Sequence, residues 1–181
     1  MTAGGRPGRT PVRLSRLDRA CLALALSYLL NDAEELVTYR SSSKRLAQML
    51  PDWVPAPRDG VSQQHVTIGI GLIGIHWIGA SLAGWRSGGR SVWFQNAAAA
   101  FGLHGFAHLG LCALRRGYVS GAVTAPAVIA LGAWTWRVLR DEQVPNRVTL
   151  PGAAASLLVL VAAHTGAEMV LAARQRHRKT P

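Results

Sequence analysis

The sequence predicts an all-α integral membrane protein, a bundle of five transmembrane helices with a short interfacial helix. Hydrophobic residues make up 49% of the 181 residues and charged residues only 16%. The apolar residues gather in five segments, each long enough to cross a bilayer as a helix. The basic residues, which give a net charge of +11, flank these segments. We therefore interpret them as headgroup anchors of a multi-pass protein of the cell membrane. Its expected partner is the lipid bilayer, and no nucleic acid is expected.

Polar turns separate the five expected spans. The spans cover residues 17–39, 65–85, 91–114, 118–139 and 150–173. We expect residues 1–16 to be a disordered basic tail, 17–173 one transmembrane domain and 174–181 a second basic tail. The 20 basic residues divide equally between the two sides of the membrane, so charge does not fix the orientation. The arginines before the first span favour an N-terminus inside the cell. The sequence predicts no oligomeric state.

The first span invites a second interpretation, and its C-terminal boundary needs a separate prediction. A basic start followed by an apolar core also resembles a signal peptide, but Asn31 and the acidic residues after it leave no small-residue cleavage site. Beyond Arg40 we expect a loop that holds a short interfacial helix, capped by Ser43 and ended by Pro51. The second span is rich in glycine, which favours close helix packing. Pro126 is expected to interrupt the fourth span.

Three carboxylates and an amide lie inside the first span. With about 100° between successive helix residues, one face carries Asn31, Glu34, Glu35 and Thr38, and Asp32 lies beside it. At the centre of a membrane helix each charge costs roughly 2.5–3.5 kcal/mol. That cost is tolerated where charges meet protein partners, so this polar face predicts a functional site inside the bundle.

The expected partners of this face are on two other spans. His104 and His108 are four residues apart on the third span, and His164 and Glu168 are four apart on the fifth. Each pair therefore shares a helix face. Spans one, three and five run in the same direction, and Glu34 lies about as far from the start of its span as the histidines do. The depths predict one shared polar layer.

Such a layer suits a divalent metal such as Zn, Fe or Mn, and it also suits acid–base chemistry. The expected metal ligands are Glu34, Glu35, His104, His108, His164 and Glu168. The expected catalytic residues are Glu34, Glu35, His104 and His108, with the glutamates as base or ligand and the histidines as ligand or acid. The first functional hypothesis is a membrane-embedded enzyme that acts on a lipophilic small molecule.

Other interpretations of the same residues stay open. Interhelical hydrogen bonds that hold a small bundle together use the same residue types, and so do proton or ion paths. The second functional hypothesis is therefore a non-catalytic accessory subunit or a small carrier. His76 is interpreted as a histidine packed beside Trp77, and Cys112 as a buried, inert thiol. Because Cys21 and Cys112 both fall in apolar segments, we expect no disulfide framework.

Three stretches, in order along the chain, resemble one known family. Asn31-Asp-Ala-Glu34-Glu35 is similar to the signature of the HXXEE family of small bacterial integral membrane proteins, a histidine followed three and four residues later by glutamates. Asn96 with Phe101-Gly-Leu-His104-Gly-Phe-Ala-His108 resembles the asparagine and histidine helix of that family. The stretch from Tyr118 to Pro126 is similar to its Tyr-x-Pro-Gly-x-x-Thr segment.

The resemblance covers residues 17–173 and implies the architecture and the site, but no activity. Two positions depart from the family pattern. Asn31 stands where the motif has histidine, and Ser120 stands where the family has proline. An amide is a poorer ligand than an imidazole for Zn, Fe or Mn. If the motif histidine binds metal in relatives, Asn31 therefore counts against a metal site here.

Overall fold

The described part of the chain folds into five α-helices and contains no β-strand. The computed structural model describes residues 13–54 and 57–177. The helices are α1 (Arg16–Met49), α2 (Gln63–Arg86), α3 (Val92–Arg115), α4 (Ala125–Asp141) and α5 (Leu150–His177). The predicted all-α class is therefore confirmed for these residues.

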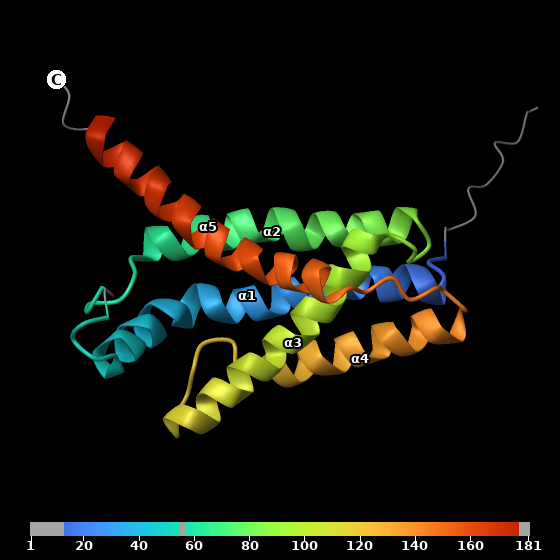
Figure 1. Ribbon diagram of the computed structural model, residues 1–181, viewed down its shortest axis with the longest axis horizontal. Coiled ribbons are helices and arrows are strands. Elements are labelled where there is room, and N and C mark those ends of the chain that lie inside the picture. The colour runs from blue at the N-terminus through green and yellow to red at the C-terminus, as the bar shows by residue number, and fades with distance from the viewer. Residues whose placement is uncertain (1–12, 55–56, 178–181) are drawn as a thin grey trace, which may run out of the picture.

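Helix α1 lies at the centre of the arrangement. In Figure 1, α2 and α4 run along its two sides, and α3 and α5 cross obliquely. Helix α1 contacts α2, α3 and α4, whereas α5 contacts α2 and α3. Helices α3 and α5 meet near their beginnings, where the Asn96 side chain accepts a hydrogen bond from the Thr149 backbone N–H. From there the two helices diverge toward their ends (Figure 1).

Three of the described helices are long and apolar enough to cross a membrane. These are α2, α3 and α5. Helix α1 has the length but carries the charged face, and α4 has only 17 residues. At 1.5 Å per residue α4 extends about 26 Å, slightly less than a hydrocarbon core of about 30 Å. Five crossings therefore remain a prediction for α1 and α4.

The predicted loop after Arg40, with its separate interfacial helix, is wrong. Helix α1 continues without a break through Arg40 to Met49. The hydroxyls of Thr38, Ser41 and Ser43 each donate to a backbone carbonyl one turn earlier, so these residues are satisfied inside a helix. Between Arg16 and Met49 the sequence contains no proline or glycine that would break the helix. At 34 residues, α1 is about 51 Å long and exceeds the thickness of a hydrocarbon core.

The predicted start of the fourth span also needs correction. Residues 118–124 are not helical, with turns at 120–124, and α4 begins at Ala125. Pro126 lies in the first turn of the helix, where its missing N–H costs nothing, so it starts α4 and does not interrupt it. At the other end of the chain, α5 continues to His177, so part of the predicted C-terminal tail is helical. The expected disordered tail covers residues 1–16, and its first 12 residues lie outside the part of the chain that the structure describes.

Glycines allow α2 to pack closely against its neighbours, as its composition predicts. A Cβ at Gly74 would lie 2.7 Å from Tyr28 Oη, and one at Gly84 would lie 2.4 Å from the Phe94 ring. Both aromatic side chains are buried. The buried core continues from Tyr28 and Phe94 to Trp77 and Phe101, which form one wall of the candidate site.

Candidate functional site

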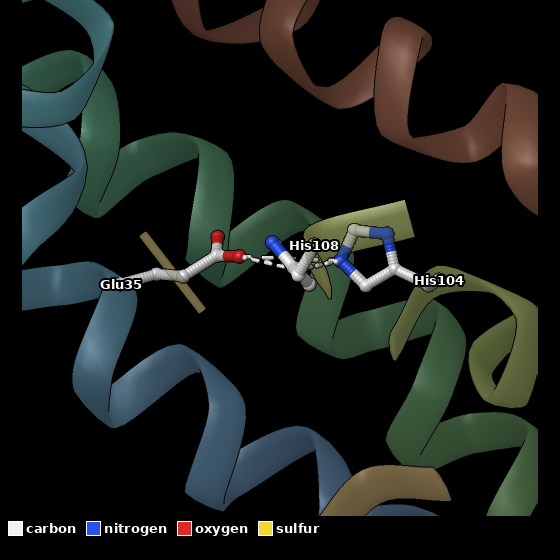
Figure 2. Close-up of side chains that lie close together, drawn as sticks. All are labelled: Glu35, His104 and His108. Atoms are coloured by element: carbon white, nitrogen blue, oxygen red, sulfur yellow. Dashed lines mark hydrogen bonds and ion pairs between the residues drawn. The ribbon is translucent and has the colours of Figure 1, made fainter. Parts of the chain in front are cut away.

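Three side chains from two helices converge in the bundle. Glu35 projects from α1, and His104 and His108 project from successive turns of α3 (Figure 2). Glu35 Oε1 lies 3.2 Å from His108 Nε2 and 3.9 Å from His104 Nε2, and the two Nε2 atoms are 2.9 Å apart. Glu35 and His108 are 8% and 7% exposed. We call these three residues the Glu–His–His cluster.

The geometry of the Glu–His–His cluster fits a metal ion. One ligand atom from each residue lies within 4.8 Å of the other two. Ligands about 2.0–2.1 Å from a tetrahedral zinc are about 3.3 Å from one another, and the three observed distances lie on either side of that value. Two histidines four residues apart on a helix can present both nitrogens to one ion. Two imidazoles and one carboxylate also leave a coordination position open, as catalytic sites do.

Asn31 and Gly121 hold the cluster in place. Asn31 Nδ2 donates to Glu35 Oε1 over 3.1 Å, and Asn31 Oδ1 lies 3.4 Å from Thr124 Oγ1. Gly121 has φ of +83°, and a Cβ there would lie 2.5 Å from the His108 ring. The loop before α4 thus packs directly on His108, at a backbone angle that favours glycine. Asn31, at the position of the motif histidine, orients the glutamate of the cluster.

Glu34, expected to join the site, has different partners. Its carboxylate accepts hydrogen bonds from Tyr118 Oη (2.5 Å), Val123 N (3.1 Å), Thr124 N (2.8 Å) and Thr124 Oγ1 (2.7 Å). These donors precede α4, where a negative charge is also favoured by the helix dipole. Burial and the hydrogen bond to Glu34 raise the pKa of the Tyr118 hydroxyl. Glu34 thereby fastens α1 to the start of α4.

His164 and Glu168 form a second cluster, together with His65 of α2. His65 Nε2 lies 2.8 Å from His164 Nδ1, and His65 Nδ1 lies 2.7 Å from Glu168 Oε1. His164 Nε2 in turn lies 3.5 Å from Tyr39 Oη. We call these four residues the polar chain.

His65 is not among the predicted site residues, because it lies at the start of its predicted span. Depth measured from one membrane face would have found it. The first span ends, the second begins and the fifth ends at the same predicted face, so Tyr39, His65 and Glu168 all lie close to that face. The prediction of one shared layer compares depths only along the first, third and fifth spans, so it does not include His65 on the second span.

A cavity of about 310 Å³ separates the two clusters. Its polar lining consists mainly of Asp32, Glu35, Tyr39, His104, His108 and His164. Ile73, Trp77 and Phe101 contribute apolar walls. Asp32 is buried and also lines this space from α1, about one turn before Glu35. Of the six predicted metal ligands, Glu35, His104, His108 and His164 therefore line one cavity, whereas Glu34 does not and Glu168 contacts His65, which is outside the cavity lining.

The remaining predicted residues lie elsewhere. His76 packs edge-on against Trp77, with ring centroids 4.7 Å apart, and accepts a hydrogen bond from the Trp93 indole. Its interpretation as a packed histidine is confirmed. Cys21 and Cys112 are both free, as expected, and the Cys112 sulfur accepts a hydrogen bond from the Val119 backbone.

Comparison with known proteins identifies the family of this chain but assigns no activity to it. Searches of curated proteins and of solved structures found no match to the chain. A family model described as a protein of unknown function with an HXXEE motif matches residues 22–135. The matched segment runs from the first turns of α1 into α4 and includes all three residues of the Glu–His–His cluster. The chain therefore belongs to the HXXEE family, and it is a helical membrane protein that carries a buried cluster of Glu35, His104 and His108.

Proposed function

We propose that this protein is a membrane-embedded, metal-dependent enzyme that acts on a lipophilic substrate. The observation that supports this most directly is the position of the Glu–His–His cluster at the wall of a largely apolar cavity. Three protein ligands would hold a divalent ion such as Zn, Fe or Mn and leave a position open toward the cavity. The ion would polarise a substrate oxygen or lower the pKa of a bound water.

Each polar residue of the site would have a separate role. Glu35, His104 and His108 are the proposed ligands, and Asn31 positions Glu35 through its hydrogen bond. Asp32 is the second carboxylate among the described cavity residues, and it would serve as an acid or base. Glu34 is left out of the catalytic set, because four hydrogen-bond donors next to α4 already occupy its carboxylate.

The cavity walls support a substrate that enters from lipid. Leu111 of α3 and Val161 of α5 both line the cavity, and they are 39% and 62% exposed on the outside of the bundle. They belong to the two helices that diverge in Figure 1. An apolar side chain on an outer face of a membrane bundle faces acyl chains. A lipophilic molecule could therefore pass between these residues without crossing water.

A metal-free network is the second candidate. A hydrogen bond between the two imidazoles accounts for their 2.9 Å contact, and Asn31 stands where the family motif has histidine. In that case the same residues would stabilise the bundle of an accessory subunit or carrier.

Metal analysis of purified full-length protein tests the proposal. We expect about one Zn, Fe or Mn ion per chain by elemental mass spectrometry, with metal lost in Glu35→Gln and in His108→Gln. His76→Gln removes a partly buried histidine outside the cluster and should retain the ion. Folded wild-type protein that binds none of the three metals after titration would support the metal-free network, and metal retained by both cluster variants would place any metal elsewhere.

A further inference from the structure

The polar chain connects the cavity to the surface of the molecule. Glu168, at one end, has a side chain that is 66% exposed. It lines a surface hollow of about 260 Å³ next to the loop between α1 and α2, together with Gly60, Val61 and Ser62. Tyr39, at the other end, lines the cavity that holds the Glu–His–His cluster. The end of α1, the start of α2 and the last part of α5 lie at the same end of the molecule (Figure 1).

The geometry of His65 distinguishes a relay from a second metal site. A chelating histidine presents one nitrogen to the ion and directs the other toward a supporting group. His65 Nε2 forms a hydrogen bond with His164, and Nδ1, the other ring nitrogen, lies 2.7 Å from Glu168 Oε1, so the two contacts involve different edges of the ring. His164 repeats this pattern, with Nδ1 toward His65 and Nε2 toward Tyr39. Four groups therefore form a line, and their ligand atoms do not converge on a point.

We propose that Tyr39, His164, His65 and Glu168 form a proton relay that carries protons from the cavity to the membrane surface. This inference rests on the proposed function, because a metal-bound water must lose a proton to become a nucleophile. The same path would remove a proton from any other acid in the cavity.

The charge on Glu168 sets the direction of the relay. An ionised Glu168 favours a proton on Nδ1 of His65, the nitrogen 2.7 Å from its oxygen, although this contact is an ion pair without the alignment of a hydrogen bond. Nε2 of His65 then accepts from Nδ1–H of His164, and Nε2 of His164 accepts from the Tyr39 hydroxyl. Every donor in this arrangement points away from the cavity.

Proton transfer along this line balances at every step. A proton from the cavity binds Tyr39 Oη as the tyrosine hydroxyl proton moves to His164 Nε2. The proton on His164 Nδ1 moves to His65 Nε2, and the proton on His65 Nδ1 moves to the Glu168 carboxylate, which releases it to water. The 3.5 Å step between Tyr39 and His164 is at the long limit of a hydrogen bond and should be the slowest.

Hydrogen–deuterium exchange of the cavity histidines tests the relay without an assay of activity. Full-length protein with ¹⁵N-labelled histidine rings is treated with a chelator, placed in lipid nanodiscs and transferred to deuterated buffer. The signal followed is the ring N–H that lies between His104 and His108, assigned by its loss in His104→Gln. In His65→Phe and in Glu168→Gln we expect exchange at least about tenfold slower than in the wild type.

The control is His76→Phe, the same substitution on the same helix but outside the polar chain, and it should leave the rate within about twofold of wild type. Glu168 is exposed, so Glu168→Gln should fold even if His65→Phe does not, and it then tests the relay by itself. Unchanged exchange in folded Glu168→Gln would overturn the relay and mean that water reaches the cluster directly. Since the protein is metal-free here, failure to bind metal would refute the proposed enzyme and leave this result standing.

Discussion

Asn31 donates a hydrogen bond to the same Glu35 oxygen, Oε1, that lies 3.2 Å from His108. The amide at the histidine position of the family motif therefore acts on the cluster through the carboxylate that both groups share. Its own carbonyl oxygen lies 3.4 Å from Thr124 Oγ1, so both ends of the amide face polar atoms. This arrangement accounts for an amide at a position where a metal site would otherwise favour imidazole.

Removal of the Asn31 amide should weaken metal binding without abolishing it. We expect Asn31→Ala to lower the affinity for a divalent ion about 10- to 100-fold, because a ligand that loses its supporting hydrogen bond is no longer held in one orientation. Calorimetric titration with Zn²⁺ measures the change. Ser27→Ala is the matched control, since Ser27 is buried one turn earlier on α1 and bonds only to its own helix. An affinity for Asn31→Ala equal to that of the control would exclude the supporting role.

The adjacent glutamates should have separable effects. Glu34→Gln should lower the free energy of unfolding by roughly 1.5–3 kcal/mol, because hydrogen bonds to a charged group are among the stronger ones, while the folded fraction still binds metal. Glu35→Gln should lose the metal. Thermal unfolding in detergent and metal content per folded chain measure the two effects. Loss of metal from folded Glu34→Gln would return Glu34 to the ligand set.

The ionisation of Tyr118 should make the junction between α1 and α4 sensitive to alkaline pH. The pKa of Tyr118 is raised in the folded protein by burial and by Glu34. The stabilisation that the neutral hydroxyl provides is therefore complete below the unfolded pKa of about 10 and is lost as pH rises through the folded pKa. Melting temperatures between pH 8 and 11 should fall more steeply for wild type than for Tyr118→Phe. Parallel curves would show that this contact contributes nothing to the pH dependence.

Gly121 should tolerate no side chain, because its backbone and its neighbour both oppose one. A Cβ would lie 2.5 Å from the His108 ring, and φ of +83° is costly for other residues. We expect Gly121→Ala to displace His108 and lower Zn²⁺ affinity at least about tenfold. Gly110→Ala on α3 meets nothing within 4 Å and serves as the control. Equal affinities in the two variants would mean that the loop does not position His108.

The helix periodicity of the sequence was enough to predict that the two histidines of α3 lie close to a carboxylate of α1. Spacing by four residues places His104 and His108 on one face, and similar depth brings Glu35 to them. Periodicity could not separate Glu34 from Glu35, which are about 100° apart on α1. The two glutamates differ because the backbone N–H groups of Val123 and Thr124 donate hydrogen bonds to Glu34. The positions of these N–H groups depend on how the loop before α4 folds.

The length of α1 could not be predicted for a similar reason. Ser41 and Ser43 favour turns and helix starts in general, and here they bond back to carbonyls of their own helix. Ser43 also accepts a hydrogen bond from the Val61 N–H, so its environment is set by a segment 18 residues away. Local sequence gave no sign of that contact.

Helix α4 provides the sharpest test of the number of membrane crossings. It is about 26 Å long and is not among the three helices that are clearly long and apolar enough to span. If α4 crosses, the loop at Gly117 and the residue after α4, Glu142, must lie on opposite sides of the membrane. Gly117→Cys and Glu142→Cys, each made in a background of Cys21→Ala and Cys112→Ala, should then react with a membrane-impermeant maleimide from opposite sides of sealed vesicles. Ser87→Cys, between α2 and α3, should label from the same side as Glu142→Cys. Labelling of Gly117→Cys and Glu142→Cys from one side would show that α4 enters and leaves the same face, and the bundle would then have four crossings or fewer.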